Sequence, residues 1–444
     1  MIIPIHRKLY NEFGKITNLH LSTSREKSVF KGIDDFIKTV YTELNHANST
    51  TKAYTPDLQE ITSDAELPRP DILESLRKKE RHADAFMPYE IYHYINQHAL
   101  GWIRFKHTIA LDPPSSPREI YIHFIVFERI SPALISQYQS YYRKIVVWLN
   151  CLSTHSSSMC SKVLNVYIYM TPHTKTLPIH GMDPVISAFN ANTGLTRGCM
   201  NNGEIVIYRK EEWFKVLIHE TMHNFGMDFL HLDLKQIYTA FKQMFCITQE
   251  VLFFETYTET WARIMNICIS AYYISGLKTF NEFMVAVKEG LEIERLFSVY
   301  QCVKVLGYMD LTYDEVSVPT PGHRKVCREL YRENTNVFAY YILGGLMMAN
   351  VEDFILWCTY NNRAHATASA TVTSDTLSHR FLPIRFNDTE KNIERFISFI
   401  GRIYRTPNTL SLIKQAEEKI LKQMKSGHET ILHTLRMTLV LEDV

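Results

Sequence analysis

The sequence lacks an excess of either charge and an uninterrupted apolar segment of membrane-spanning length. Its formal net charge of +1 gives no global basic field, which argues against a nucleic-acid partner. The longest apolar run, residues 338–351, contains two glycines and is too short to span a bilayer, so we predict a buried helix and no membrane partner. The amino terminus also lacks the apolar stretch of a signal peptide. We therefore expect a soluble, cytoplasmic protein.

The chain also lacks paired cysteine motifs and internal repeats. Its 8 cysteines are scattered, with no CxxC pair, which predicts reduced thiols in a reducing compartment rather than a disulfide framework. Hydrophobic residues make up 46% of the chain and charged residues 21%, so an ordered globular protein is expected. A chain of 444 residues is long enough for two or three structural units.

Periodicity and turn residues divide the chain into three regions. The first, residues 1–97, reads as helices joined by polar linkers, with helices at 28–44 and 73–82 and a surface loop at 45–70. The second, residues 98–226, contains strands at 101–110, 119–128, 163–170 and 204–208 and helices at 131–152 and 210–225. Ser131 with Pro132 is a typical helix start, and Gly226 a typical helix end. The third, residues 227–444, is mostly helical, with a loop at 364–378.

This order of elements predicts an α+β fold that is predominantly helical. The strands all fall in the middle region and are few, so they predict a small mixed sheet. A helical subdomain is expected to follow the helix at residues 210–225. That helix contains the residues for which the sequence suggests a chemical role.

His219 and His223 are four residues apart and therefore lie one turn apart on the same face of the predicted helix. Two imidazoles placed in this way can bind one Zn²⁺ ion. Glu220 lies beside the first histidine, where a carboxylate can take a proton from a zinc-activated water. This is the chemistry of the HExxH pattern, and its alternative is a buried pair of structural histidines. The apolar pattern of residues 213–218, which continues into the motif, favours the metal site.

A catalytic zinc site needs a third protein ligand, and the downstream candidates are Asp228, His231, Glu255 and Glu259. Both glutamates fall on one side of a predicted helix, in the segment FETYTETWA. This E-x-x-x-E spacing resembles gluzincins, in which the first acid binds zinc and the second holds a ligand histidine. The resemblance favours Glu255 as ligand and Glu259 behind it, with Asp228 a further supporting acid. Two surface acids on an amphipathic helix are the alternative.

The string HETMHNFGMD also resembles the metzincin motif, in which a glycine bend brings a third histidine to the metal. Phe229 stands where that histidine is expected, Met222 replaces the usual glycine, and His231 comes two residues late. Met265 falls within a predicted helix, so no methionine turn is recognisable. The gluzincin-like assignment is therefore preferred.

The sequence also offers candidate residues for two further parts of a peptidase site, the strand that aligns the substrate and the donor to the oxyanion. Residues 201–208 read either as the edge strand along which zincins align a peptide or as an ordinary strand. Tyr340, Tyr341 and His323 are candidate donors for the developing oxyanion, and each is also a plausible packing or surface residue. We place His323 in a loop, because its segment PTPGHR contains two prolines and a glycine.

Residues 163–358, and above all the run EIVIYRKEEWFKVLIHETMHNFGMDF, resemble uncharacterised metallopeptidases predicted in large nucleocytoplasmic DNA viruses. The resemblance implies a zincin fold, a Zn²⁺ cofactor, a host-cytoplasm or virion setting, and site roles for His219, Glu220, His223 and Glu255. We expect peptide-bond hydrolysis, first as an endopeptidase, with a peptide or protein as the substrate. The rival reading is a catalytically silent zincin with a structural or virion-interaction role. Neither the substrate nor the oligomeric state follows from the sequence.

Overall fold

The computed structural model describes residues 4–17, 30, 32–51, 54–63, 66–77, 87–111, 117–178, 185–229, 231–232, 234–274, 279–362, 382–424 and 427–440. The fold is α+β and mostly helical, with a mixed six-stranded sheet, as predicted. The chain divides into two units, one comprising residues 40–175 and 187–230 and the other residues 1–39, 176–186 and 231–444. The three sequence regions proposed above stay a prediction.

The first unit contains the sheet and the HExxH segment. Its strands are β1 (Asp57–Glu60), β2 (Gly101–Ile109), β3 (Arg118–Val126), β4 (Val163–Tyr169), β6 (Gly194–Thr196) and β7 (Asn202–Ile207). Its helices are α3 (Asp71–Arg77), α5 (Tyr89–His98), α6 (Pro132–Ser153), α7 (Ala188–Ala191) and α8 (Trp213–Asn224). Helix α2 (Asp34–Thr50) and the short strand β5 (Ile186–Ser187) cross the division between the units.

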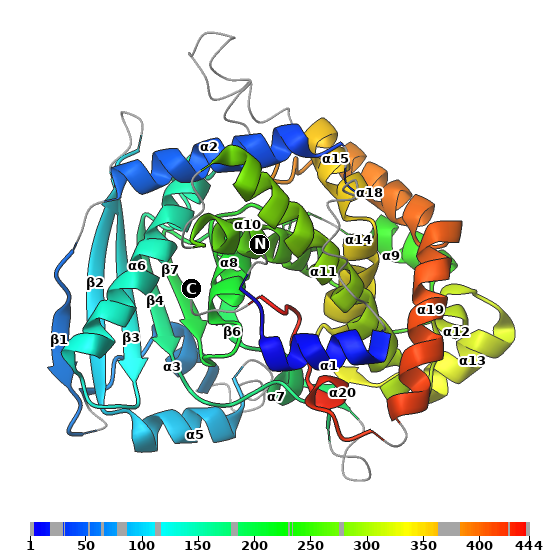
Figure 1. The fold of residues 1–444 in the computed structure, drawn as a ribbon, viewed down its shortest axis with the longest axis horizontal. Helices are drawn as coiled ribbons and strands as arrows, with labels where there is room; N and C mark the ends of the chain where they lie inside the picture. Colours follow the sequence, from blue (N-terminus) through cyan, green and yellow to red (C-terminus); the bar gives the residue numbers. More distant parts are fainter. Residues whose placement is uncertain are drawn as a thin grey trace, which may run out of the picture. The chain divides into compact units, whose positions relative to one another are not determined.

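The strand order is β1-β2-β3-β4-β7-β6, with parallel pairing at β3–β4 and β4–β7 and antiparallel pairing elsewhere (Figure 1). The prediction that residues 163–170 form a central strand is confirmed by β4. Of the two readings offered for residues 201–208, the structure supports the ordinary strand, because β7 is paired on both sides. The edge strand next to β7 is β6, which was too short to stand out in the sequence.

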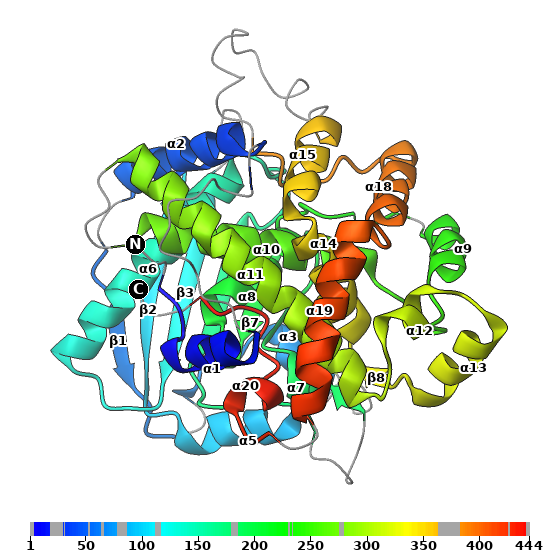
Figure 2. The same cartoon turned by 45° about the vertical axis from the view of Figure 1, so that its right-hand side comes forward.

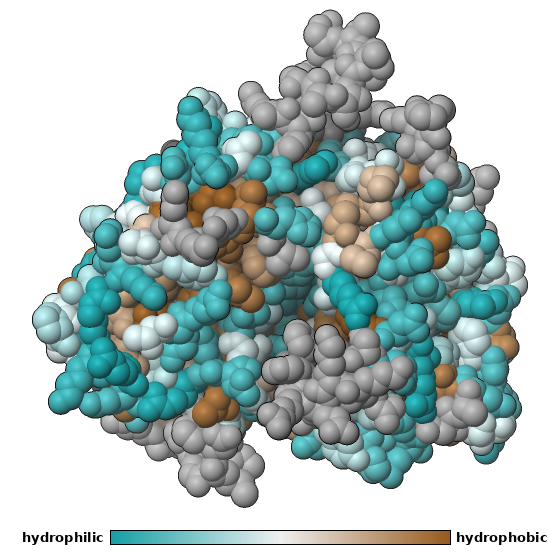
Figure 3. All heavy atoms as spheres, turned by 180° about the vertical axis from the view of Figure 1, so that it is seen from behind, coloured by the Kyte–Doolittle hydropathy of each residue, from teal (hydrophilic) through white to brown (hydrophobic). Residues whose placement is uncertain are grey.

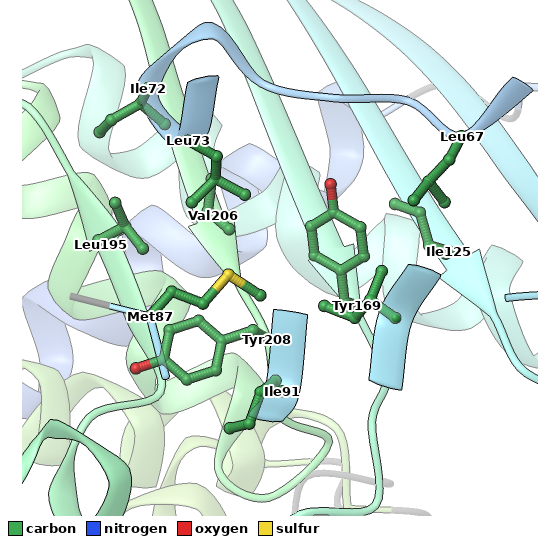
Figure 4. Packing of buried hydrophobic residues seen from close by; sticks show 11 residues of the cluster. Leu67, Ile72, Leu73, Met87, Ile91, Ile125, Tyr169, Leu195, Val206 and Tyr208 are labelled. Atoms are coloured by element: carbon green, nitrogen blue, oxygen red, sulfur yellow. The ribbon is translucent and has the colours of Figure 1, made fainter. Parts of the chain in front are cut away.

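The two faces of the sheet are covered by different helices. On one face Phe105 stacks on Tyr142 of α6 and Phe124 packs against Tyr138 of the same helix. On the other face, α3 and α5 close over a cluster that includes Ile125, Tyr169 and residues of β6 and β7 (Figure 4). Alternating side chains of each strand therefore enter separate cores, as the period of two in a β-strand requires.

Several local predictions in this unit are confirmed and others are wrong. The strands predicted at 101–110 and 119–128 are β2 and β3, and Ser131 accepts a hydrogen bond from the Leu134 amide at the start of α6. The loop predicted at 45–70 is instead partly helix α2 and strand β1. The helix predicted at 73–82 corresponds to α3 up to residue 77, and the predicted residues 78–82 lie outside the described part of the chain.

The second unit is built from helices around α11. Its elements are α1 (Arg7–Thr17), α9 (Lys235–Met244), α10 (Phe253–Tyr272), α11 (Phe280–Tyr308), α12 (Tyr313–Ser317), α13 (Pro321–Leu330), β8 (Glu333–Asn334), the π-helix η2 (Phe338–Leu343), α14 (Gly344–Ala349), α15 (Val351–Asn361), α18 (Glu390–Ile403), α19 (Pro407–Met424) and α20 (Thr430–His433). Figure 2 shows α11 among α10, α14 and α19, against which it packs. The loop predicted at residues 364–378 lies outside the described residues.

The apolar run at residues 338–351 is buried, as predicted, but it is not one regular helix. It starts as η2 and continues as α14. Within the described residues, no single helix is long and apolar enough to cross a membrane, and the one helix pair that passes together, Phe338–Ala349 with Val351–Asn361, is bent by 90°. On the face drawn in Figure 3, apolar side chains gather in patches on a largely hydrophilic surface.

The expectation that all cysteines are reduced is wrong for one pair. Cys160 and Cys199 form a disulfide, whereas the other six cysteines are free and buried. The two partners are 39 residues apart, so no spacing motif marks them. They meet because the segment before β4 and the turn between β6 and β7 lie together at one end of α8, where both cysteines pack near Gly226.

Candidate metal centre

Helix α8 carries the complete HExxH segment and is buried along its whole length. The side chains of His219 and His223 leave the same face, and their Nε2 atoms lie 3.1 Å apart. Glu220 is 7% exposed, so the carboxylate is held within the protein and not in bulk water. The structure therefore brings two imidazole nitrogens to one point beside a buried acid.

The separation of these two nitrogens fits a shared metal ion. A tetrahedral zinc ion with Zn–N bonds of 2.0–2.1 Å holds two ligand nitrogens about 3.3 Å apart. The observed 3.1 Å between the Nε2 atoms is close to that value. Structural histidines that merely fill a core need not turn the same nitrogen toward each other, so this geometry favours a metal site.

Asp228 sets the orientation of the second imidazole. Its carboxylate accepts a hydrogen bond from Nδ1 of His223. A proton on Nδ1 leaves Nε2 as the metal-binding nitrogen, which is the role that carboxylates commonly play behind ligating histidines. The contact is consistent with the supporting role that the sequence suggested for Asp228.

The turn after α8 brings Asp228 back to the helix. Gly226 has φ +64° in the left-handed region, where glycine is favoured. The Gly226 amide donates to the His223 carbonyl and the Met227 amide to the Met222 carbonyl, the pattern of a Schellman end. The prediction that Gly226 ends the helix is confirmed, and the reversal places Asp228 five residues after His223 on the same side.

The amino-terminal end of α8 is fixed by buried charges. Lys175 Nζ lies 2.7 Å from the Glu212 carboxylate, and both side chains are almost fully buried. Arg209 donates to the backbone carbonyls of Asn192, Thr174 and Phe189. A buried ion pair is costly to break, so these contacts restrict how α8 can start.

The carboxy-terminal end is fixed by a polar network. Asn224 accepts a hydrogen bond from Ser161 and donates to Thr196 Oγ1 at 3.0 Å. Arg118 is fully buried and donates to the carbonyls of Ser161, Ser157 and Cys160. Burial lowers the pKa of this guanidinium to about 10, so it stays charged at neutral pH. The guanidinium also stacks on Phe225, the residue that follows α8.

Glu255 is the third member of the one group within the described residues that could hold a metal ion. One ligand atom each from His219, His223 and Glu255 lies within 4.8 Å of the others. Two imidazoles and a carboxylate are a donor set that zinc accepts. Glu259, Asp228 and His231, the other candidates for the third position, are not in this group, and His231 is exposed.

Tyr340 contacts the carboxylate of Glu255. Its phenol donates to Glu255 Oε2 at 3.2 Å. Tyr340 belongs to the π-helix η2, a distortion that is frequent at functional sites. The residue that the sequence offered as an oxyanion donor is thus placed against the candidate ligand.

Side chains of α10 bind the widened backbone of η2. Thr256 Oγ1 donates to the Ala339 carbonyl at 3.2 Å, and Arg263 Nη2 donates to the Tyr340 carbonyl at 2.9 Å. Arg263 also pairs with Glu259 at 3.0 Å, and both side chains are buried. Glu259 is thus paired with an arginine, and its proposed role behind a ligand histidine stays a prediction.

We predicted that His323 lies in a loop, but it lies in the first turn of helix α13. The prolines and glycine of its segment start this helix, because Thr320 caps it and Pro321 occupies the first turn. The His323 Nδ1 atom lies 2.8 Å from the Val318 carbonyl. Tyr341 is committed elsewhere, since its hydroxyl donates to the Leu435 carbonyl. Their roles as oxyanion donors stay predictions.

The supporting residues Arg118, Lys175, Arg209 and Arg263 were not found from the sequence. Each is a buried cation, which is unusual for a charged side chain. The signal available for two of them was an arginine beside or within an apolar run, as in the segments REIYIHFIV and WARIMNICI. Their partners are distant in sequence and could not be identified.

Comparisons with protein-family models, with curated proteins and with solved structures found no match to this chain. The zincin resemblance noted in the sequence therefore stays a prediction.

Proposed function

We propose that the protein is a zinc-dependent peptidase in which His219, His223 and Glu255 bind the metal ion. The observation that carries the proposal is the convergence of the two Nε2 atoms at 3.1 Å, with Glu220 buried on the same turn of α8. The separate contact of Asp228 with His223 Nδ1 supports it, because a purely structural pair does not need a fixed tautomer.

The chain's own residues have distinct tasks in such a reaction. Zinc, when bound, supplies Lewis acidity that lowers the pKa of a water molecule toward neutrality. Glu220 accepts the proton of the attacking water and returns it to the leaving amine nitrogen. Asp228 keeps His223 in the metal-binding tautomer, and Tyr340 holds one oxygen of Glu255. Tyr340 and His323 stay candidates for the oxyanion donor.

We propose a peptide or protein substrate bound in extended form. Strand β6 is an edge strand of the sheet and lies against α8, so its free side can pair with a peptide backbone. Strand β6 takes this role in place of β7, for which the sequence had left open an edge strand or an ordinary strand. Endopeptidase action, in the cytoplasm of an infected cell or in a virion, is part of the same proposal and rests on the sequence resemblance.

The decisive experiment combines metal analysis with Glu220→Gln. We expect the wild-type protein to bind one zinc ion and to cleave members of a peptide library. Glu220→Gln should keep the zinc and lose about 10²- to 10⁴-fold in kcat, the usual contribution of a general base. The control Glu60→Gln, at an exposed position of β1, should leave both properties unchanged.

Two results would contradict the proposal. A protein that binds no zinc would remove the metal centre. Zinc binding without cleavage of any library member would favour the rival function, a catalytically silent structural or virion-interaction protein.

A further inference from the structure

Strand β6 lies along one stripe of α8. Val216, Glu220 and Asn224 are spaced four residues apart and so share a face of the helix. Thr196 of β6 accepts a hydrogen bond from Asn224 at 3.0 Å. Gly194, two residues earlier, faces the same way, since alternate residues of a strand share a face. Leu195, between them, joins the cluster on the opposite face of the sheet.

Gly194 lies directly opposite the carboxylate of Glu220. A Cβ atom built at residue 194 would lie 3.1 Å from Glu220 Oε1, 2.8 Å from Val216 Cγ1 and 3.0 Å from the Val206 carbonyl oxygen. Even the smallest side chain would therefore press on the acid. Among the described glycines, only Gly226 has a positive φ, so Gly194 is not needed for an unusual backbone angle. The absence of a side chain at Gly194 therefore leaves space for the neighbouring side chains of α8.

We propose that Gly194 is a positioning residue for Glu220, because the missing side chain leaves the volume that the general-base carboxylate occupies. The Thr196–Asn224 hydrogen bond fixes the register of β6 against α8, so the empty position falls opposite Glu220 and not one turn away. This inference rests on the proposed function for the role of Glu220. The close packing of β6 against α8 at Gly194 is independent of that function.

A methyl group at residue 194 should push the carboxylate away from its reacting position without touching the histidines. Misplacement by about 1 Å can cost about 100-fold in rate. The 3.1 Å contact requires the carboxylate to move by only a few tenths of an ångström, so we expect Gly194→Ala to lower kcat about 10-fold while zinc content and KM stay near the wild-type values. A general loss of structure would instead lower zinc content and thermal stability together.

A double-mutant cycle with Glu220→Asp separates these cases. Aspartate is one methylene shorter, so the contact with the new methyl group is relieved. In the Glu220→Asp background, Gly194→Ala should change kcat less than threefold, although it costs about 10-fold in the wild-type background. Equal losses in both backgrounds, or a loss below threefold in the wild-type background, would overturn the inference.

Two glycine controls test the specificity of this coupling. Gly203→Ala places a Cβ 2.6 Å from Asn224 Oδ1 and Ser161 Oγ, at the other end of the same helix stripe, so its loss should be equal in both backgrounds. Gly322→Ala meets only Thr320 Oγ1 at 3.9 Å and should be neutral. If Gly203→Ala shows the same rescue by Glu220→Asp, the coupling is not specific to residue 194 and the inference fails.

A structural readout separates this inference from the proposed function. Crystal structures of the wild type and Gly194→Ala should show the Glu220 carboxylate displaced by a few tenths of an ångström and the histidine rings in place, whether or not the protein has peptidase activity. An unmoved carboxylate overturns the inference, whereas an inactive wild type overturns only the proposed function. If Gly194→Ala does not fold, the set is repeated in a Val216→Ala background, which removes the closest contact.

Discussion

Helices α8 and α10 carry the proposed ligands but are held in different ways. Helix α8 is fixed at its two ends, by the buried pair of Lys175 with Glu212 and by the Asn224 network beside Gly226. Helix α10 is fixed along its length, because Thr256 and Arg263 bind carbonyl groups of the π-helix η2.

This comparison distinguishes the contacts that hold a helix in place from the contacts that orient one of its side chains. The contacts at the two ends of α8 fix the position of the helix that carries the histidines. Asp228 then orients the imidazole of His223. The contacts of α10 instead place a second helical segment, whose Tyr340 holds the carboxylate. We infer that α8 is preorganised for metal binding by its termini and α10 by its neighbour, and the following variants test this in order of effect.

Arg263→Met should give the largest effect, because it removes the cation beside the buried Glu259 and a donor to η2. Breaking a buried pair in this way costs about 3–5 kcal/mol of unfolding free energy. Chemical denaturation measures the loss. The control Arg295→Met removes a more exposed pair with Glu292 and should cost about 1 kcal/mol or less. Equal losses for the two variants would show that α10 does not depend on the buried pair.

Glu333, which accepts a hydrogen bond from the Phe338 amide at the start of η2, should give the helical unit a pH dependence because its carboxyl is buried. Burial raises the pKa of its carboxyl from 4.5 to about 7. The folded state thus keeps a proton that the unfolded state loses, so this stability is complete below pH 4.5 and is lost as pH rises through 7. Its size is about 3 kcal/mol at most. Denaturation between pH 4.5 and 8 should show the decline in the wild type and in Glu329→Gln, an exposed control, but not in Glu333→Gln.

Asp228→Asn tests the turned imidazole of α8. The amide can no longer hold the proton on His223 Nδ1 as a carboxylate does, so zinc affinity should fall about 10- to 100-fold. Competition with a metal chelator measures the affinity. The exposed Asp314→Asn, whose partner is Arg405, is the control and should bind zinc as the wild type does. Unchanged affinity for Asp228→Asn would mean that α8 alone orients the histidine.

Tyr340→Phe should have the smallest effect, a loss of zinc affinity of about 10-fold. It removes one hydrogen bond to a charged group, which is worth about 1.5 kcal/mol at the low end of the usual range. Tyr341→Phe is the matched control, because it deletes the neighbouring hydroxyl, which binds the Leu435 carbonyl instead. A loss as large for Tyr341→Phe would assign the effect to η2 as a whole and not to the contact with Glu255.

The sequence predicted the parts of this site that depend on local spacing. His219 and His223 share a helix face because they are four residues apart, and Gly226 ends that helix because a left-handed residue is needed there. The strands at residues 101–110 and 119–128 were evident from alternation.

What the sequence could not predict depends on tertiary contacts. Strand β6 has three residues and no alternation to detect, so residues 201–208 were considered as a possible edge strand in its place. The carbonyl groups of η2 are bound by residues of α10 that lie 77–83 positions earlier in the chain. The space that Gly194 leaves for Glu220 exists only after strand and helix have packed.

The disulfide between Cys160 and Cys199 has a practical consequence for any biochemist who purifies this protein. Thiol reductants, which are a routine precaution for a chain with six other cysteines, would cut a covalent tie beside the last turn of the histidine-bearing helix. Preparations intended for metal titration should therefore be made without such reagents, and their free thiols counted before zinc is added.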